Sequence, residues 1–139
     1  MNLGLALLII HSLVRWIVVI IGIVALVLFA VAWARKRGDA QQQNRWMRWF
    51  TIALDTQVLL GIILILYDAI GLGQGFPLPR IEHAVTMLVA LGVAHSSVRW
   101  RQAEPVAQAR AYTFILLGAL ILIFIGVSLL GIGRWTFRM

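Results

Sequence analysis

The sequence predicts an all-α integral membrane protein, folded as a four-helix up-down-up-down bundle. Of its 139 residues, 62% are hydrophobic and 12% are charged, which leaves too little polar surface to coat a soluble globule of this size. Four apolar stretches, at about 3–34, 49–71, 79–98 and 111–133, are each near or above the roughly 20 residues that a helix needs to cross a bilayer. No alternation typical of membrane strands is present, so helices are the expected spans. We expect a single domain over residues 1–139.

The connections between the stretches predict how the chain sits in the membrane. The first stretch has no basic residues before it and is long, so we expect a retained span and not a cleaved signal peptide. Five basic residues follow it within 35–48, and three more fall within 99–110. The connection near 71–80 carries only Arg80. Because basic connections stay cytoplasmic, both termini are predicted to face outward, an N-out/C-out topology.

Composition also excludes several classes of function. The chain has no cysteine, which excludes disulfides, thiolate metal sites and covalently attached haem. The formal charge of +7 gathers at the ends of the apolar stretches, as membrane topology requires, so we expect membrane lipid and not nucleic acid as the partner. No motif typical of hydrolases or nucleotide-binding enzymes appears.

Two histidines carry the functional prediction. An ionisable side chain inside a bilayer is costly and usually faces a partner, a cavity or a cofactor. His11 lies early in the first span and His83 early in the third, and these spans run in the same direction in the predicted topology. Both imidazoles should therefore lie near the outer membrane face, on helices that are diagonal in a simple bundle. Two neutral imidazoles placed in this way suit axial ligation of haem iron.

Other residues at helical spacing support this interpretation. Arg15, one turn after His11, and Arg80, three residues before His83, are candidates to pair with haem propionates. Arg80 is equally well explained as an ordinary interfacial charge. Gly22 and Gly61 are candidates to leave space for the macrocycle, although small residues also simply let membrane helices approach closely.

These segments resemble the small bacterial membrane cytochromes of b type, which include cytochrome b561-like four-helix bundles. The resemblance is architectural and rests on HSLVRW at 11–16, DTQVLLG at 55–61 and the stretch 82–95. It implies noncovalent haem b with two histidine ligands, and one-electron transfer to a redox partner protein or a quinone. It also implies a multi-pass protein of the bacterial inner membrane. An electron-transfer protein is favoured over a stand-alone enzyme.

His95 leaves three interpretations open. It lies twelve positions, or about 18 Å of helix rise, beyond His83 and close to the cytoplasmic face. Asp55 of the second span should lie at a similar depth and is its expected hydrogen-bond partner. His95 is then the ligand of a second haem, part of a quinone site with Asp55, or half of a structural pair that joins two helices. Two-haem relatives use four histidines, and this chain has three.

Two other classes of function remain open for the whole chain. The first is a noncatalytic accessory or assembly subunit of a respiratory complex, whose histidines only tie helices together. The second is a small transporter-like homo-oligomer, which would need a polar path through the bilayer.

Overall fold

The computed structural model describes residues 2–135, and every regular element in that range is helical. The main helices are α1 (Leu3–Ala34), α2 (Ala40–Leu66), α3 (Leu78–His95) and α4 (Pro105–Ser128). Three short elements extend them: the π-helical turn η1 (Tyr67–Gly71) and the 3₁₀ turns η2 (Ser96–Trp100) and η3 (Ile132–Trp135).

Four helical segments are long and apolar enough to span a membrane, as predicted. They are Leu3–Ala34, Ala40–Gly71, Leu78–Trp100 and Pro105–Ser128. Large aliphatic and aromatic side chains cover much of their outer surface, which is the side that a bilayer would solvate. The prediction of an all-helical chain with four candidate membrane spans is therefore confirmed.

The second and fourth helices begin earlier than predicted, at 40 and 105 instead of 49 and 111. Asp39 caps α2, because its carboxylate accepts the backbone N–H groups of Gln41 and Gln42 at 3.0 and 3.2 Å. Glu104 caps α4 in the same way, and Pro105 occupies the first turn, where its missing N–H costs nothing. The apolar stretches therefore marked the apolar part of each helix, while the capping residues mark where the helix starts. The fourth helix also ends earlier than predicted, at Ser128.

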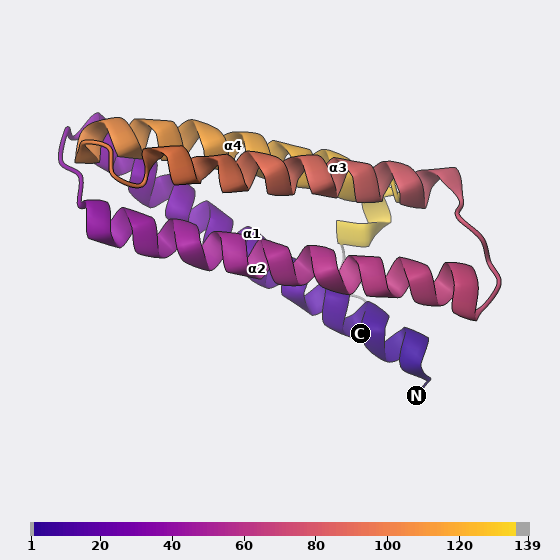
Figure 1. Ribbon diagram of the computed structural model, residues 1–139. Helices are drawn as coiled ribbons and strands as arrows, with labels where there is room; N and C mark the ends of the chain where they lie inside the picture. Colours follow the sequence, from indigo (N-terminus) through magenta and orange to yellow (C-terminus); the bar gives the residue numbers. More distant parts are fainter. Residues whose placement is uncertain (1, 136–139) are drawn as a thin grey trace.

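α1 packs against α2 and α4, and α3 packs against α4 and α2. α2 and α4 also contact each other across the bundle, while α1 and α3 do not pack closely over the described residues. The two basic connections lie at one end of the bundle, and the α2–α3 connection lies at the other end with the N-terminus (Figure 1). The helices meet around a buried apolar core that includes Val18, Phe29, Phe50, Leu54 and Leu116.

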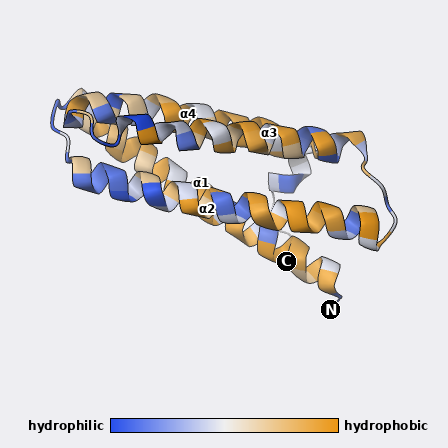
Figure 2. Cartoon of the chain, in the orientation of Figure 1, coloured by the Kyte–Doolittle hydropathy of each residue, from blue (hydrophilic) through white to orange (hydrophobic). Residues whose placement is uncertain are grey.

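A buried polar network closes the basic end of the bundle. Gln108, fully buried on α4, contacts Gln43 of α2 through its Oε1 at 2.8 Å and donates to the carbonyl oxygens of Trp100 and Arg101. Tyr112 donates its hydroxyl to Asn44 at 2.6 Å. Hydrophilic residues concentrate at this end, whereas the opposite half of the helices is mostly apolar (Figure 2).

Candidate functional site

A cavity of about 770 Å³ lies at the end of the bundle opposite the polar network. All four main helices contribute to its wall, and most of the wall is apolar. Its size falls within the range of about 300–1,000 Å³ that is typical of small-molecule and cofactor sites. Five of the residues predicted from the sequence line it together: His11, Arg15, Gly61, Arg80 and His83.

The orientation of the His83 ring follows from how α4 ends. The last carbonyl groups of a helix have no partner within it and must find one elsewhere. Here the carbonyls of Ile125, Val127 and Ser128 accept backbone N–H groups of the residues that follow α4. The Gly126 carbonyl instead lies 2.7 Å from Nδ1 of His83. A carbonyl oxygen only accepts, so Nδ1 carries the hydrogen in the neutral ring. Nε2 is then left with a bare lone pair and has no hydrogen-bond partner among the described residues.

Gly126 brings α3 and α4 close enough for this contact. A Cβ added there would collide with the Met87 methyl group and would lie 3.2 Å from Cγ2 of Thr86. No specific role was assigned to Gly126 from the sequence. Its carbonyl has the role of holding the His83 ring, and sequence alone gives no signal for that contact.

The His11 ring lies between Gln57 and Gly61 of α2. Its Nε2 is 3.2 Å from the side-chain nitrogen of Gln57, and a Cβ added at Gly61 would lie 3.1 Å from its Cε1. Nδ1 of His11 and Oε1 of Gln57 are buried without a hydrogen-bond partner among the described residues. Because an amide nitrogen only donates, Nε2 of His11 accepts in this contact and the neutral ring carries its hydrogen on Nδ1.

Two arginines at the cavity have no carboxylate partner in the part of the chain that is described. Arg15 donates to the Ser12 hydroxyl at 3.2 Å, and its guanidinium lies 5.7 Å from the ring centroids of both Trp16 and Trp135. Nε of Arg15 is buried without a hydrogen-bond partner there. Arg134, in η3, lines the same cavity. Its role was not predicted, because a basic residue after the last span is the ordinary pattern of a membrane protein.

Arg80 differs from these two because it is already paired. Its Nη1 donates to Oδ2 of Asp68 at 3.0 Å, and both residues line the cavity. Asp68 lies in the π-helical turn η1 and was also missed, although an acidic residue at the end of an apolar span is a detectable signal. Arg80 therefore has less capacity for a second anion than Arg15 has.

No protein-family model, curated protein or solved structure matches this chain. Nor does any group of three or more His, Asp or Glu side chains in residues 2–135 form a site that could hold a metal ion. The functional argument therefore rests on the cavity and its two imidazoles. A haem bound by two histidines needs only those two protein ligands.

His95 and Asp55 form the hydrogen-bonded pair that their predicted depths suggested. Nε2 of His95 lies 2.7 Å from Oδ1 of Asp55, which joins α3 to α2. Their side chains are 52% and 47% exposed, so the pair lies on the outer face of the bundle. Neither residue lines the His11–His83 cavity.

Gly22 is buried away from the cavity, so it does not provide the space predicted for it there. A Cβ at this position would lie 2.7 Å from Cδ2 of Leu120 and 3.0 Å from Cε2 of Phe50. Gly22 instead allows α1, α2 and α4 to approach closely, which is the common role of glycine in membrane helices.

Proposed function

We propose that this chain is a membrane b-type cytochrome that holds one haem b noncovalently between His11 and His83. The supporting observation is the His83 ring, whose Nδ1–H is held by the Gly126 carbonyl while Nε2 remains unpartnered among the described residues. Histidines that ligate metals almost always donate their other ring N–H to a carbonyl, carboxylate or water. When bound, the haem would supply reversible one-electron chemistry.

The remaining wall of the cavity suits the same ligand. His11 lines the same cavity and comes from α1, which is diagonal to the helix of His83. The Gln57 amide nitrogen donates to Nε2 of His11, so ligation through Nε2 would require Gln57 to release that nitrogen. Gly61 has no side chain, which leaves room for the His11 ring beside it, because even a Cβ there would lie 3.1 Å from Cε1 of that ring. The residues here would bind and orient the macrocycle, and the apolar wall would exclude water from it.

Charge at the cavity fits a ligand with two carboxylates. Haem b carries two propionates, and Arg15 and Arg134 are two cations without a carboxylate partner in the described chain. A charge-assisted hydrogen bond to a carboxylate is roughly twice as strong as a neutral one. Arg15 and Arg134 would therefore fix the propionate edge of the haem, and Arg80 would remain with Asp68.

The proposal includes a place in the cell. We assign the chain to the bacterial inner membrane as an up-down-up-down bundle, with the basic connections cytoplasmic and both termini outside. The two basic connections lie at the same end of the bundle, which supports this orientation (Figure 1). The haem would then lie nearer the outer face, within reach of a redox partner protein.

Visible spectroscopy of the purified protein tests the function directly. We expect a low-spin b-type spectrum after reduction with dithionite, and about one haem per chain in a pyridine haemochrome assay. Protein from a haem-sufficient host that showed no such absorbance, and gained none on titration with hemin, would contradict the proposal. An accessory or transporter-like role would then be favoured.

The His95–Asp55 pair favours a second, smaller ligand over a second haem. It lies on the outer face and does not line the His11–His83 cavity. Because the pair places an imidazole and a carboxylate, groups that bind polar oxygens, on the exposed outer face, we propose a quinone headgroup as its ligand. His95→Ala should then leave the haem content unchanged and slow oxidation or reduction of the haem by a soluble quinone analogue. An unchanged rate would leave the structural pair as the explanation, and a loss of half the haem would restore the second-haem interpretation.

A further inference from the structure

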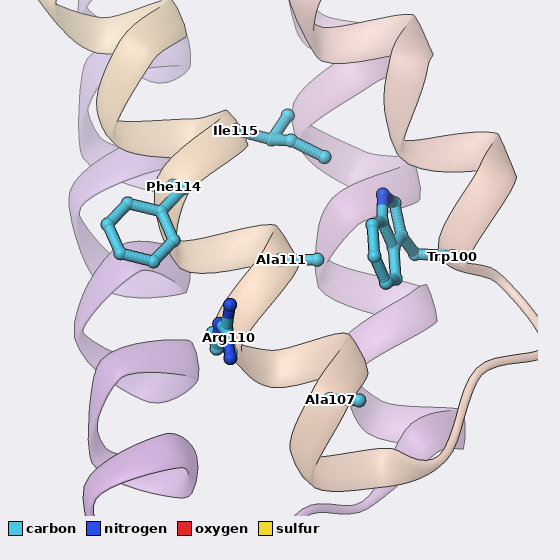
Figure 3. Close-up of a pocket in the computed structure, with 6 residues that line it drawn as sticks. All are labelled: Trp100, Ala107, Arg110, Ala111, Phe114 and Ile115. Carbon is cyan, nitrogen blue, oxygen red and sulfur yellow. The ribbon is translucent and has the colours of Figure 1, made fainter.

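A second cavity, an apolar groove of about 390 Å³, lies on the outer face of α4 at the basic end of the bundle. It shares no lining residue with the His11–His83 cavity. Six residues line it, as Figure 3 shows: Trp100, Ala107, Arg110, Ala111, Phe114 and Ile115. We propose that this groove binds an anionic phospholipid, with the phosphate at Arg110 and the first part of an acyl chain over the two alanines.

The shape of the groove suits a flexible chain. Ala107 and Ala111 are one turn apart on α4 and leave a low floor. The Trp100 ring stands on one side of this floor, and Phe114 stands on the other side of the helix (Figure 3). Trp100 and Phe114 are 42% and 56% exposed, so neither is packed into the bundle. Tryptophan beside a basic connection is typical of the level where lipid headgroups meet the acyl chains.

The charge at the groove favours an anionic headgroup. Arg110 is exposed and has no ion pair or hydrogen bond within residues 2–135. The acidic residue nearest to it in sequence, Glu104, is occupied, because its carboxylate oxygens accept the N–H groups of Val106 and Ala107 at 3.1 Å. Eight of the twelve Lys and Arg residues fall within 35–48 and 99–110. A free guanidinium at this level is suited to pair with a lipid phosphate.

The rest of α4 argues against a helix of a second copy as the occupant. Helices that pair in membranes use small residues along the contact so that their backbones can approach closely. On the side of α4 that carries the two alanines, Ile115 follows and ends the low floor (Figure 3). A Cβ at Gly118, further along this side, would lie 3.8 Å from Cγ1 of Val93, so that position is turned toward α3. On the adjoining side, Leu117, Ile121 and Phe124 are 42%, 50% and 60% exposed. The low floor is therefore confined to two turns at the headgroup end, which is long enough for part of a lipid and too short for a helix.

The test is native mass spectrometry of the full-length protein in detergent, titrated with phosphatidylglycerol or with phosphatidylcholine of the same acyl chains. We expect the first bound phosphatidylglycerol to have a dissociation constant about five-fold lower than that of phosphatidylcholine, as one nearby cation provides. Arg110→Gln should abolish this preference, while Arg48→Gln, an exposed cation on α2, should keep it. Ala111→Phe, which fills the floor, should remove one tightly bound lipid, while Ile121→Phe on the same helix should not.

Three results would overturn the proposal. The first is equal affinity of the wild-type protein for the two lipids. The second is an Arg110→Gln variant that behaves as Arg48→Gln does. The third is a dimer that Ala111→Phe, and not Ile121→Phe, converts to a monomer, because the groove would then hold a second copy of the chain.

Discussion

Replacing His83 with alanine distinguishes two roles for this residue: ligating haem, or only joining α3 to α4 through a hydrogen bond. In the protein without haem, the replacement removes one hydrogen bond, from Nδ1 to the Gly126 carbonyl at 2.7 Å. Such a bond contributes about 1 kcal/mol net to the free energy of unfolding. The ring lines an existing cavity, so its removal opens no new void in the packed core and adds little to that cost. A purely structural His83 therefore predicts a loss of about 1 kcal/mol and no spectral change.

A ligating His83 predicts a much larger effect on the haem. The low-spin signal should disappear, and haem affinity should fall by more than the roughly 10–100-fold typical of changes to outer-shell partners of a metal. His95→Ala is the matched control, because it makes the same change on the same helix outside the cavity. Reduced and oxidised spectra, electron paramagnetic resonance and haem stoichiometry would be measured for both variants. A His83→Ala protein with the wild-type low-spin spectrum and full haem content would refute the reasoning.

Three further changes test the rest of the site and its orientation. Gly61→Val should displace the His11 ring, since even a Cβ would lie 3.1 Å from its Cε1, and should weaken the low-spin signal in electron paramagnetic resonance; an unaltered signal would show that His11 does not ligate. Arg15→Gln should speed haem loss to apomyoglobin several-fold while Arg80→Gln, already paired in the wild type, changes it less; equal effects would contradict the assignment of the propionate edge. Ala40→Cys should react with an impermeant thiol reagent only from the cytoplasmic side, and labelling of intact cells from outside would reverse the topology.

The common cavity of His11 and His83 was predictable because helical periodicity is regular. Val18 on α1 and Met87 on α3 follow the two histidines at helical spacing, so each should lie on the same side of its helix as the histidine. Both are buried, so this side of each helix faces the interior of the bundle. Depth along a membrane helix follows from sequence position at about 1.5 Å per residue, which also placed His95 level with Asp55.

The contacts that orient the imidazoles were not predictable. Gln57 meets His11 only because α1 and α2 have a particular rotation and register, and Gly126 meets His83 for the same reason on α3 and α4. A glycine in a membrane span carries no sequence signal that separates a close approach from a ligand-facing space. Gly22, Gly61 and Gly126 look alike in the sequence and have three different environments in the fold.

The helix starts were predictable in principle from capping residues, although apolarity alone placed them too late. Asp39 and Glu104 each come directly before a helix and accept its first free N–H groups. The polar first turns of α2 and α4 are helical because tertiary hydrogen bonds also hold them, such as the one between Gln43 and Gln108. Hydropathy indicates which part of a helix has an apolar surface. It does not indicate where the backbone hydrogen bonds of that helix begin or end.

The two ends of the bundle are joined differently, and this difference gives a last prediction. At the basic end, side chains of Gln43, Asn44 and Gln108 connect α2 to α4 and to the chain between α3 and α4. At the cavity end, α1 and α3 are diagonal and do not pack closely over the described residues. A haem held by His11 and His83 would be the link between them, so binding should stabilise the bundle by mass action. At free haem about 100 times its dissociation constant, the gain is about 2.7 kcal/mol.

This gain is measurable as a rise in the unfolding temperature of the purified protein when haem is added. His83→Ala should lose most of the rise, whereas His95→Ala should keep it, because the His95–Asp55 pair joins α3 to α2 outside the cavity. Zinc protoporphyrin, which has the same propionates and accepts fewer axial ligands, should give a smaller rise. An equal rise with both porphyrins would mean that the cavity binds the macrocycle through its apolar wall and arginines alone, and that the two imidazoles do not bridge α1 and α3 through iron.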